Sequence, residues 1–522
     1  MQPQKKRDSW GSRLGIIMAV AGSAVGLGNF LRFPAKAASN GGGAFMIPYF
    51  VALFLLGIPL MWIEWTLGRF GGGFEHGTAP GIFHSIWQKN RFIKYFGVIG
   101  IFGPLIIFIY YVYIESWTLA YSFFALIGKC RALPDQAAMQ SFLRGFQGLE
   151  VNQYFHGIHL AYLFFVITFI LNIWVIYYGI KGGIERLCKR AMPLLFIFGL
   201  ILLIRVVTLG TPDPDKPTWN ILNGFGFLWN ADFSALTSAK VWLEAAGQIF
   251  FTLSVGIGVI LTYASYLSKG DDVVLSGLTA SSTNELAEVI LGSSIIIPAA
   301  FVFFGPIDIQ SIAKSGVFNL GFVTMPLILN KLPWPVILSF IWFFLLFLAG
   351  LTSSVSLAQP AVAFLEDEFD ITRKKAVVIF GVVVFILCQP VIFFLKNGVV
   401  DELDFWGGTF FLVLFATIET LLFAWVFGME KAWDEIHKGA DMQVPQVYKF
   451  IIKYITPLFL FFILGMWLWQ EWLPIIFMKR VLPLDRVYIL GTRIGLVLVF
   501  LILAALVKIA WGKKKIQKVR LG

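Results

Sequence analysis

Charged residues are scarce in this sequence. Of its 522 residues, only 14% are Asp, Glu, Lys or Arg, whereas a soluble globular protein carries about 25%. The hydrophobic share is 58% and the mean hydropathy is +0.80. Apolar runs of about 20 residues recur along the chain, and each is long enough to cross the hydrocarbon core of a bilayer. The composition excludes an ordinary soluble domain and predicts one multi-pass membrane domain over residues 1–522.

Cysteine and histidine are also rare. The three cysteines, Cys130, Cys188 and Cys388, are far apart, and the five histidines form no HxxxH or HExxH pattern. This usage gives neither a disulfide framework nor a metal motif. The glycine-rich stretch "GSAVGLGN" is not GxGxxG and follows no strand, so it predicts no nucleotide loop. With no nucleophile–base pair either, the sequence argues against an enzyme.

The net charge of +11 is the one marked excess. Its basic residues lie in short loops between apolar runs, such as "WQKNRFIK" and "DITRKK". Loops of this kind mark the cytoplasmic side of a membrane protein, so we expect a lipid bilayer as partner and no nucleic acid. We expect no cleavable signal peptide, because the first apolar run is too long.

Length and apolarity predict about twelve spans. They lie near residues 12–37, 42–70, 90–126, 158–179, 191–209, 241–268, 275–305, 335–366, 374–395, 402–427, 447–474 and 484–511. An even number of spans places both termini in the cytoplasm. We therefore expect a multi-pass protein of the plasma (cytoplasmic, or cell inner) membrane.

Two of these spans contain glycine-rich interruptions. The first is broken at "GSAVGLGN" and the sixth at "FFTLSVGIG", and five spans separate their starts. Paired interruptions in corresponding positions of two halves are typical of transporters built from inverted repeats, with the binding site at the breaks. The alternative is GxxxG helix packing, as from Gly22 to Gly26, but the second matching break favours the transporter.

A helix break inside a membrane frees backbone groups that must find partners in a cavity. Its positive helix ends attract a carboxylate, and its negative ends attract cations. A zwitterionic amino acid together with Na⁺ matches this arrangement. Asn29, Thr252, Ser254 and Asn284 supply amide and hydroxyl groups near the breaks. For each single hydroxyl, a bond to its own helix backbone remains an alternative.

Eight motifs together resemble the neurotransmitter:sodium symporter family, and most closely its bacterial leucine-transporter branch. They are "RLGIIMAVAGSAVGLGNFLRFP", "GGGAFMIPY", "GIPLMWIEW", "IYYVYIESW", "GQIFFTLSVGIG", "SSTNELAEVILG", "AGLTSSVSLAQP" and "DELDFWGGT". The resemblance implies an all-α membrane fold in which helices 1 and 6 unwind at the midplane. It implies two inverted five-helix repeats, at 12–209 and 241–427, followed by two further helices at 447–511.

The resemblance also implies two Na⁺ sites and one amino-acid site. The first Na⁺ site would use Ala24, Asn29, Thr252, Asn284 and the substrate carboxylate. The second would use Gly22, Val25, Ala349, Thr352 and Ser353. Backbone and hydroxyl contacts to the substrate would come from Ala24, Gly26, Leu27, Gly28, Tyr111, Phe251, Thr252 and Ser254. The side-chain pocket would be Val25, Ile107, Tyr111, Phe251, Ser254, Ile257, Ser353 and Leu357, some of which could instead be ordinary packing residues.

Gates follow from the same resemblance. Arg32 and Asp404 would form a water-linked outer ion pair, with Tyr111 and Phe251 as a lid beneath it. The cytoplasmic gate would be formed by Arg7, Trp10, Ser265, Tyr266, Gln359 and Asp367. Arg32 could instead anchor the helix at the interface, and Arg7 could be a positive-inside residue.

Glu288 is an acidic residue within a predicted span, and such residues are functional candidates. Animal members of the family have a neutral residue at the matching position and require chloride. The resemblance therefore implies a chloride-independent transporter, with proton return on Glu288 as a hypothesis; a packing carboxylate is the alternative. Glu64, Glu115 and Glu419 are assigned to structural networks.

Substrate choice depends on three departures from the leucine-transporter pattern. Ser23 stands where that branch often has Asn, Ile257 replaces a common aromatic ring, and Ile107 is larger than the usual Val. We expect Na⁺-coupled symport of a small neutral, aliphatic amino acid, with leucine, methionine or alanine as leading candidates. A Na⁺-independent exchanger of the same fold and a non-transporting sensor are the alternatives. Assembly as a homodimer stays open.

Overall fold

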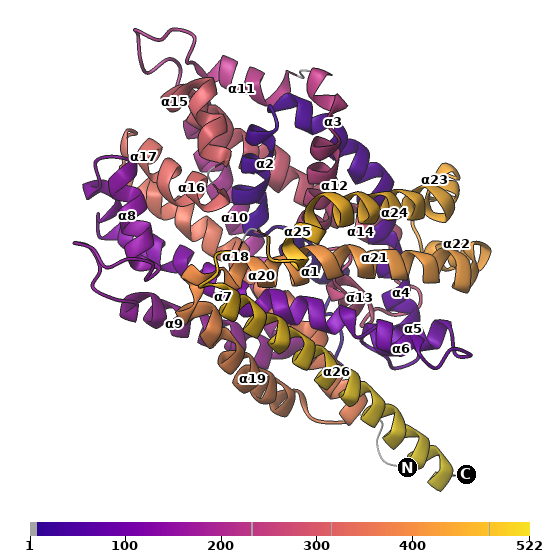
Figure 1. The fold of residues 1–522 in the computed structure, drawn as a ribbon. Helices are drawn as coiled ribbons and strands as arrows, with labels where there is room; N and C mark the ends of the chain where they lie inside the picture. The colour runs from indigo at the N-terminus through magenta and orange to yellow at the C-terminus, as the bar shows by residue number, and fades with distance from the viewer. Residues whose placement is uncertain (1–7, 231–232, 315, 480, 522) are drawn as a thin grey trace.

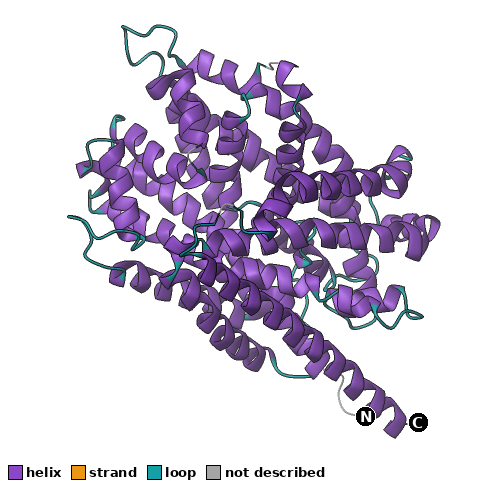
Figure 2. Cartoon of the chain, in the orientation of Figure 1, coloured by secondary structure: helices purple, strands orange, loops and turns teal. Residues whose placement is uncertain are grey.

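The computed structural model describes residues 8–230, 233–314, 316–479 and 481–521. Within these ranges every regular element is helical, and no strand occurs (Figure 2). The predicted all-α membrane class is confirmed. Arg7, which was assigned to the cytoplasmic gate, lies outside the described residues.

The helices of the N-terminal part of the chain, from Arg13 to Ala264, include both predicted breaks. In chain order they are α1 (Arg13–Ala24), α2 (Phe33–Ser39), α3 (Gly43–Ala52), α4 (Ile58–Gly72), α5 (Ala79–Ile86), α6 (Ile93–Phe96), α7 (Ile99–Leu126), α8 (Gln136–Phe146), α9 (His159–Tyr177), α10 (Arg186–Val207), α11 (Ile221–Trp229), α12 (Ala239–Leu253) and α13 (Val259–Ala264). Polar side chains cap the first turns of α1 and α8, where Ser12 accepts from Gly15 N and Asp135 from Ala138 N. Such caps satisfy backbone donors that the helix itself leaves unpaired.

The helices of the second half are longer on average and include the central helix α18. They are α14 (Val274–Glu285), α15 (Ser294–Lys314), α16 (Val317–Asn319), α17 (Met325–Asn330), α18 (Pro335–Phe369), α19 (Arg373–Phe393), α20 (Val399–Leu403), α21 (Phe411–Leu421), α22 (Met429–His437), α23 (Val447–Phe450), α24 (Thr456–Trp467), α25 (Leu473–Ile476) and α26 (Arg486–Leu521). Several spans also contain a wider π-helical turn. Those near the site are η1 (Gly28–Arg32), η6 (Leu286–Ser293) and η9 (Asp404–Phe410).

Ten helical segments of the described chain are long and apolar enough to cross a membrane, and the bent pair Arg13–Ala24 and Gly28–Ser39 makes an eleventh. Of the predicted spans, the one at 241–268 is divided between α12, with 15 residues, and α13, with 6. Neither helix alone is long enough to span a bilayer, which needs about 20 residues. This division explains why fewer continuous helices than predicted spans are found.

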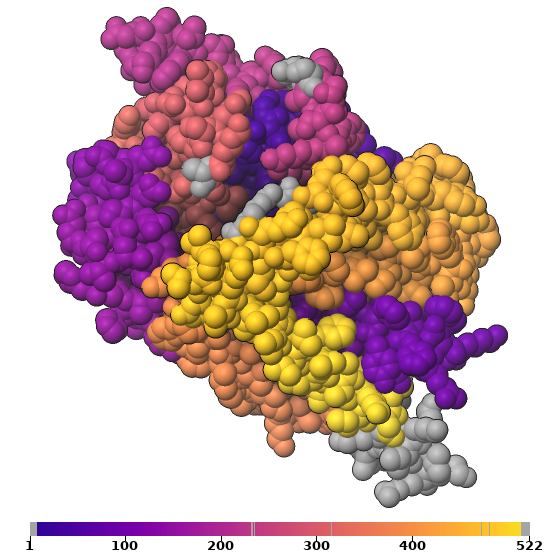
Figure 3. Space-filling model, in the orientation of Figure 1, coloured from indigo at the N-terminus to yellow at the C-terminus, as the bar shows by residue number. Residues whose placement is uncertain are grey.

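The centre of the bundle is formed by α1, α7 and α18. The helices α7 and α18 pack along each other, and α1 packs against α10, α14 and α18. Figure 1 shows α1 and α18 in the middle of the molecule. By contrast, α26 runs along the outside of the molecule, as Figure 3 shows. Many of its exposed side chains are apolar. Apolar side chains on an outer surface are expected where the solvent is lipid.

The two helix breaks lie next to each other at this centre. α1 ends at Ala24 and the two parts of its span are bent by 44°. α12 ends at Leu253, where Ser254 takes the left-handed conformation with φ 54°. Ser254 Oγ donates to the carbonyl of Ser23 at 2.9 Å, and Asn29 Nδ2 donates to Thr252 Oγ1 at 3.1 Å. The sequence positions of both interruptions therefore coincide with the ends of helices that contact each other.

Candidate functional site

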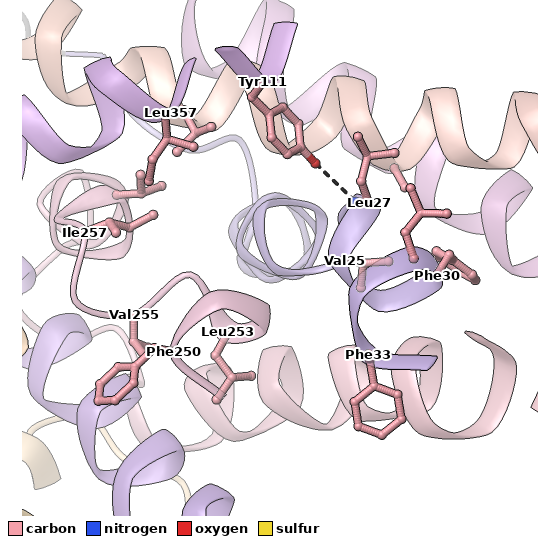
Figure 4. Packing of buried hydrophobic residues seen from close by; sticks show 14 of the residues in the cluster. Val25, Leu27, Phe30, Phe33, Tyr111, Phe250, Leu253, Val255, Ile257 and Leu357 are labelled. Carbon is pink, nitrogen blue, oxygen red and sulfur yellow. Dashed lines mark hydrogen bonds between the residues drawn. The ribbon is translucent and has the colours of Figure 1, made fainter. Parts of the chain in front are cut away.

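A small cavity of about 40 Å³ lies where the two breaks meet α7 and α18. It is lined by Ser23, Ala24, Gly26, Gly28, Asn29, Ile107, Tyr111, Phe250, Phe251, Ser254, Ile257, Ser353, Ser356, Leu357 and Leu412. Of the residues predicted to bind substrate, only Val25, Leu27 and Thr252 are not part of this lining. Figure 4 shows Tyr111 pointing toward the backbone of Leu27, with Leu357 and Ile257 on the other side. The sequence therefore identified most of the wall.

The first break offers its backbone to the cavity because two of its residues have no side chain. A Cβ on Gly26 would lie 2.7 Å from Ser353 Oγ and 2.9 Å from Tyr111 Oη, and a Cβ on Gly28 would lie 2.6 Å from the Phe251 ring. Only glycine permits such close approach. The amide of Leu27 donates to Tyr111 Oη at 3.1 Å. Amide groups at a helix N-terminus favour negative charge, which suits a carboxylate.

Neutral oxygen-bearing groups converge beside the cavity, as predicted for the first Na⁺ site. Asn29 Oδ1 accepts from Gly26 N at 2.8 Å, and Asn29 Nδ2 contacts Thr252 Oγ1 at 3.1 Å. One terminal atom of the Asn284 amide lies 2.8 Å from Asn29 Nδ2 and 3.2 Å from the Ala24 carbonyl oxygen. All four predicted protein ligands of this site are thus brought together.

Glu288 lies behind this cluster and is fully buried. Its carboxylate accepts hydrogen bonds from Gln248 and from Thr252, and from Tyr49 Oη at 3.0 Å. Tyr49 Oη also contacts Glu285 at 2.9 Å. Glu288 is therefore in direct contact with Thr252, a predicted ligand, and supplies a carboxylate close to the predicted cation. Glu285 is an additional acid that the sequence analysis did not single out.

The predicted second Na⁺ site lies between α1 and α18. Ser353 Oγ contacts the Gly22 carbonyl at 3.3 Å, and Thr352 Oγ1 contacts the Ala349 carbonyl at 3.2 Å. A Cβ on Gly22 would lie 3.2 Å from the Cβ of Thr352, so the two helices touch here. Val25 follows directly on the end of α1, where its amide donates to the Ala21 carbonyl at 2.7 Å. Within the described ranges no hydrogen bond joins it to Thr352 or Ser353.

The chemistry of these donors fits an alkali cation. Sodium, like other hard cations, is bound by oxygen, and the two clusters offer carbonyl, amide and hydroxyl oxygens. Within the described ranges no group of three or more His, Cys, Asp or Glu side chains could hold a metal ion. The donor sets are thus unsuited to a transition metal and suited to Na⁺.

Aromatic side chains close the cavity on the side of the predicted outer gate. The Arg32 guanidinium lies over the Phe251 ring, 4.4 Å from its centroid. Asp404 accepts a hydrogen bond from Tyr110 Oη at 2.7 Å. Each of the two predicted gate charges therefore has its own neighbour in this structure, and their water-linked pairing stays a prediction. Tyr110 was not foreseen, although it directly precedes Tyr111.

Several residues of the predicted cytoplasmic gate form hydrogen bonds that join the N-terminal segment and α18 to α13 and the residues after it. Trp10 Nε1 donates to the Tyr263 carbonyl at 3.0 Å, and Gln359 Nε2 donates to Tyr266 Oη at 2.9 Å. Gln359 Oε1 accepts from Arg373 at 2.8 Å. Ser265 lies at the end of α13, and Asp367 lies at the end of α18, where both have polar or packing contacts. Arg373 is a gate neighbour that the sequence analysis assigned only to a basic loop.

A second layer of contacts holds the start of α1 on the same side. Gly11 N donates to Glu185 at 2.7 Å, and Arg13 forms ion pairs with Asp272 at 2.7 Å and with Asp441 at 2.6 Å. The hydrogen bond from Arg13 lowers the pKa of the exposed Asp441 carboxyl. These contacts connect the start of α1 to the residues that precede α14 and α10.

The remaining buried acids join helices rather than line the cavity. Glu64 of α4 accepts from the backbone amides of Gly256 in the second break and of Leu261 in the first turn of α13. Its carboxyl group lies beside that of Glu419. Glu115 accepts from Asn172 at 3.1 Å. These contacts agree with the predicted structural role. Glu64 has the more specific task, because it pairs amides that the break leaves free.

Four cavity residues were not predicted as site residues: Ser23, Phe250, Ser356 and Leu412. Ser23 was noted only as an unexplained departure. Ser356 could have been found, since it lies three residues after Ser353 and therefore on the same face of α18. Leu412 belongs to α21, and no sequence pattern connects it to the breaks.

Known proteins resemble this chain in sequence and in fold. The sequence profile described as "Sodium:neurotransmitter symporter family" matches residues 7–134 and 129–512. An uncharacterized sodium-dependent transporter of Methanocaldococcus jannaschii is 33% identical over 469 residues, covering 87% of this chain and 89% of that protein. Sodium-dependent nutrient amino acid transporter 1 of Drosophila melanogaster is 27% identical over 523 residues, covering 88% and 77%. The crystal structure of MhsT in complex with L-phenylalanine aligns with a TM-score of 0.75 at 30% identity, covering 88% of this chain and 99% of that chain.

Proposed function

Because the chain belongs to the sodium:neurotransmitter symporter family, we propose that it couples the inward movement of Na⁺ to the uptake of a small neutral amino acid. As a member of this family it is a sodium-dependent transporter and not an enzyme. The observation that carries the proposal is the convergence of Asn29, Thr252 and Asn284 beside a cavity bounded by two helix breaks.

The amino-acid backbone would be held by the two breaks. Its carboxylate would lie against the amides of Gly26, Leu27 and Gly28 and the Tyr111 hydroxyl, where the helix end favours negative charge. Its ammonium would face the carbonyls of Ala24, Phe251 and Thr252 and the hydroxyl of Ser254. MhsT was crystallised with L-phenylalanine, which supports an amino acid as the ligand here.

Coupling would follow from a shared shell of oxygens. The substrate carboxylate would complete the coordination begun by Ala24, Asn29, Thr252 and Asn284, so that each ligand raises the affinity for the other. A second Na⁺ held by Gly22, Val25, Ala349, Thr352 and Ser353 would join α1 to α18. Two cotransported ions per cycle are therefore expected.

Chloride would not be needed. Glu288 supplies a carboxylate in contact with Thr252, so the negative charge that balances the cation belongs to the protein itself. On the return step, without substrate and Na⁺, Glu288 would bind a proton and become neutral. The proton would then move outward as Na⁺ and substrate move inward, which is proton counter-transport. Buried acids within spans are expected to have such roles.

The side chain of the substrate would be aliphatic. Ile107, Ile257 and Leu357 line the cavity with aliphatic side chains. A change of one methylene in such a pocket alters binding by about 1–3 kcal/mol, so medium-sized or small aliphatic amino acids such as leucine, methionine or alanine are favoured. Tighter binding of tryptophan than of every aliphatic amino acid would contradict this.

Transport would proceed by alternating access. The contact of Arg32 with Phe251 would open on one side. On the other side, the hydrogen bonds from Trp10 to Tyr263 and from Gln359 to Tyr266 would open in turn. The segments 12–209 and 241–427 would act as the inverted repeats, with 447–511 as two additional helices. Both termini would face the cytoplasm in the plasma membrane.

A binding screen of the natural amino acids on purified protein tests the proposal. In NaCl at least one small neutral amino acid should bind, and binding should vanish when Na⁺ is replaced by K⁺. Binding that persists in K⁺ would indicate a Na⁺-independent exchanger. Binding in NaCl without concentrative uptake in proteoliposomes would indicate a sensor.

A further inference from the structure

Two serine hydroxyl groups meet at the wall of the cavity. Ser23 of α1 and Ser356 of α18 both line it, and their Oγ atoms are 2.7 Å apart. The exposed fractions are 3% for Ser23 and 0% for Ser356. Buried hydroxyl groups need hydrogen-bond partners, and the sequence pattern gave no reason for a serine at position 23.

The direction of this hydrogen bond follows from counting protons. Ser356 Oγ donates its only proton to the carbonyl of Ser353 at 2.6 Å. Either oxygen of the pair has the geometry to donate. When Ser356 donates to the Ser353 carbonyl, the proton between the two serines comes from Ser23, because each hydroxyl has a single proton. Ser23 Oγ is then left with acceptor capacity alone. Among the described residues Ser23 Oγ has no hydrogen-bond partner other than Ser356.

Apolar side chains share the cavity wall with the Ser23 hydroxyl. Phe250, Ile257 and Leu412 line the same cavity with apolar side chains. The carbonyl of Ser23 accepts from Ser254 Oγ at 2.9 Å and from Ser353 Oγ at 3.0 Å. Both donors are predicted pocket residues, so Ser23 lies among the groups that would surround a bound side chain.

We propose that Ser23 is a specificity-determining residue that accepts a hydrogen bond from a side-chain hydroxyl of the substrate. Of two small neutral amino acids of the same shape, the one with a side-chain hydroxyl is then bound more tightly, so threonine binds ahead of valine. This inference rests on the proposed function. It goes further because it names the substrate group and the residue that recognises it.

Threonine and valine provide the matched ligands, since they differ by one hydroxyl in place of one methyl group. We would measure the Kd of each for the purified full-length protein in NaCl. A net hydrogen bond contributes about 0.5–1.5 kcal/mol, so threonine should bind about two- to tenfold more tightly. Ser23→Ala should reduce this ratio to about one, and Ser23→Thr, which keeps the hydroxyl, should preserve it.

The ratio of the two constants separates recognition from a structural role, because a serine pair that merely joins α1 to α18 would shift both constants equally. Ser122→Ala is the matched control, since this buried serine donates to Leu119 O within α7 and does not line the cavity. A wild-type ratio of one or less, or a ratio unchanged in Ser23→Ala, would overturn the inference alone. If Ser23→Ala fails to fold, the wild-type ratios for threonine over valine and serine over alanine decide. Binding of no amino acid in NaCl would contradict the proposed function itself and the inference with it.

Discussion

The Arg32 guanidinium lies over the ring of Phe251, 4.4 Å from its centroid. A Cβ on Gly28 would lie 2.6 Å from the same ring. One aromatic side chain therefore contacts both the backbone of the first break and the charge of the predicted outer gate. A cation over an aromatic face is stabilised by about 0.5–2 kcal/mol, with the larger values where water is excluded.

Replacing this ring should make the substrate escape faster. Phe251→Leu keeps an apolar side chain but removes the face that Arg32 covers, so the dissociation rate of a labelled substrate should rise about two- to thirtyfold. The dissociation rate is measured by diluting the purified protein with bound labelled substrate and following the loss of label with time. Phe123→Leu, on an exposed part of α7, is the control, and an unaltered dissociation rate in Phe251→Leu would argue against the lid.

Adding one methyl group at the first break should weaken substrate binding strongly. A Cβ on Gly26 would lie 2.7 Å from Ser353 Oγ and 2.9 Å from Tyr111 Oη, so Gly26→Ala would displace α7 or α18 from the break. We expect the apparent Kd to rise at least about tenfold. Gly103→Ala is the matched control, because nothing lies within 4 Å of its added Cβ. Wild-type affinity in Gly26→Ala would show that the substrate does not lie against this backbone.

Removing one hydroxyl should weaken Na⁺ binding selectively. Thr252→Val keeps the shape of the side chain but removes the oxygen that contacts Asn29, Asn284 and Glu288. The Na⁺ concentration for half-maximal substrate binding should rise about tenfold. Thr417→Val serves as control, since Thr417 is buried and its hydroxyl donates to the Val413 carbonyl of its own helix. An unchanged Na⁺ dependence would place the cation elsewhere.

Glu288 should determine the anion requirement. Uptake by the wild-type protein should be equal in chloride and in gluconate, because the carboxylate beside Thr252 supplies the balancing charge. Glu288→Ser removes that charge, and uptake should then depend on chloride. The measurement is Na⁺-driven uptake in proteoliposomes at matched ionic strength. Chloride dependence of the wild type, or a Glu288→Ser variant indifferent to chloride, would disprove the assignment.

The fold was largely predictable because membrane spans can be recognised in a sequence by their length and apolarity. The helix breaks were also predictable, since glycine and hydroxyl residues are conspicuous in apolar runs. The π-helical turns such as η1 and η6 were not predicted. A single extra residue in one turn leaves the hydrophobic pattern almost unchanged, so composition does not reveal it.

For the site, residues within motifs were predictable and residues supplied by packing were not. Ala24, Tyr111 and Ser254 belong to quoted motifs and line the cavity. Leu412 reaches the cavity only because α21 packs beside the second break, where a Cβ on Gly256 would lie 2.7 Å from its carbonyl oxygen. Such contacts depend on the tertiary arrangement, which a single sequence does not specify.

Concentrative uptake by proteoliposomes tests the central claim most directly. Vesicles containing the purified protein should accumulate a labelled small neutral amino acid when Na⁺ is high outside and K⁺ is inside, and an ionophore that dissipates the Na⁺ gradient should release it. The account predicts accumulation above the external concentration only while that gradient lasts. Equal accumulation with K⁺ on both sides, or none under any gradient, would contradict it.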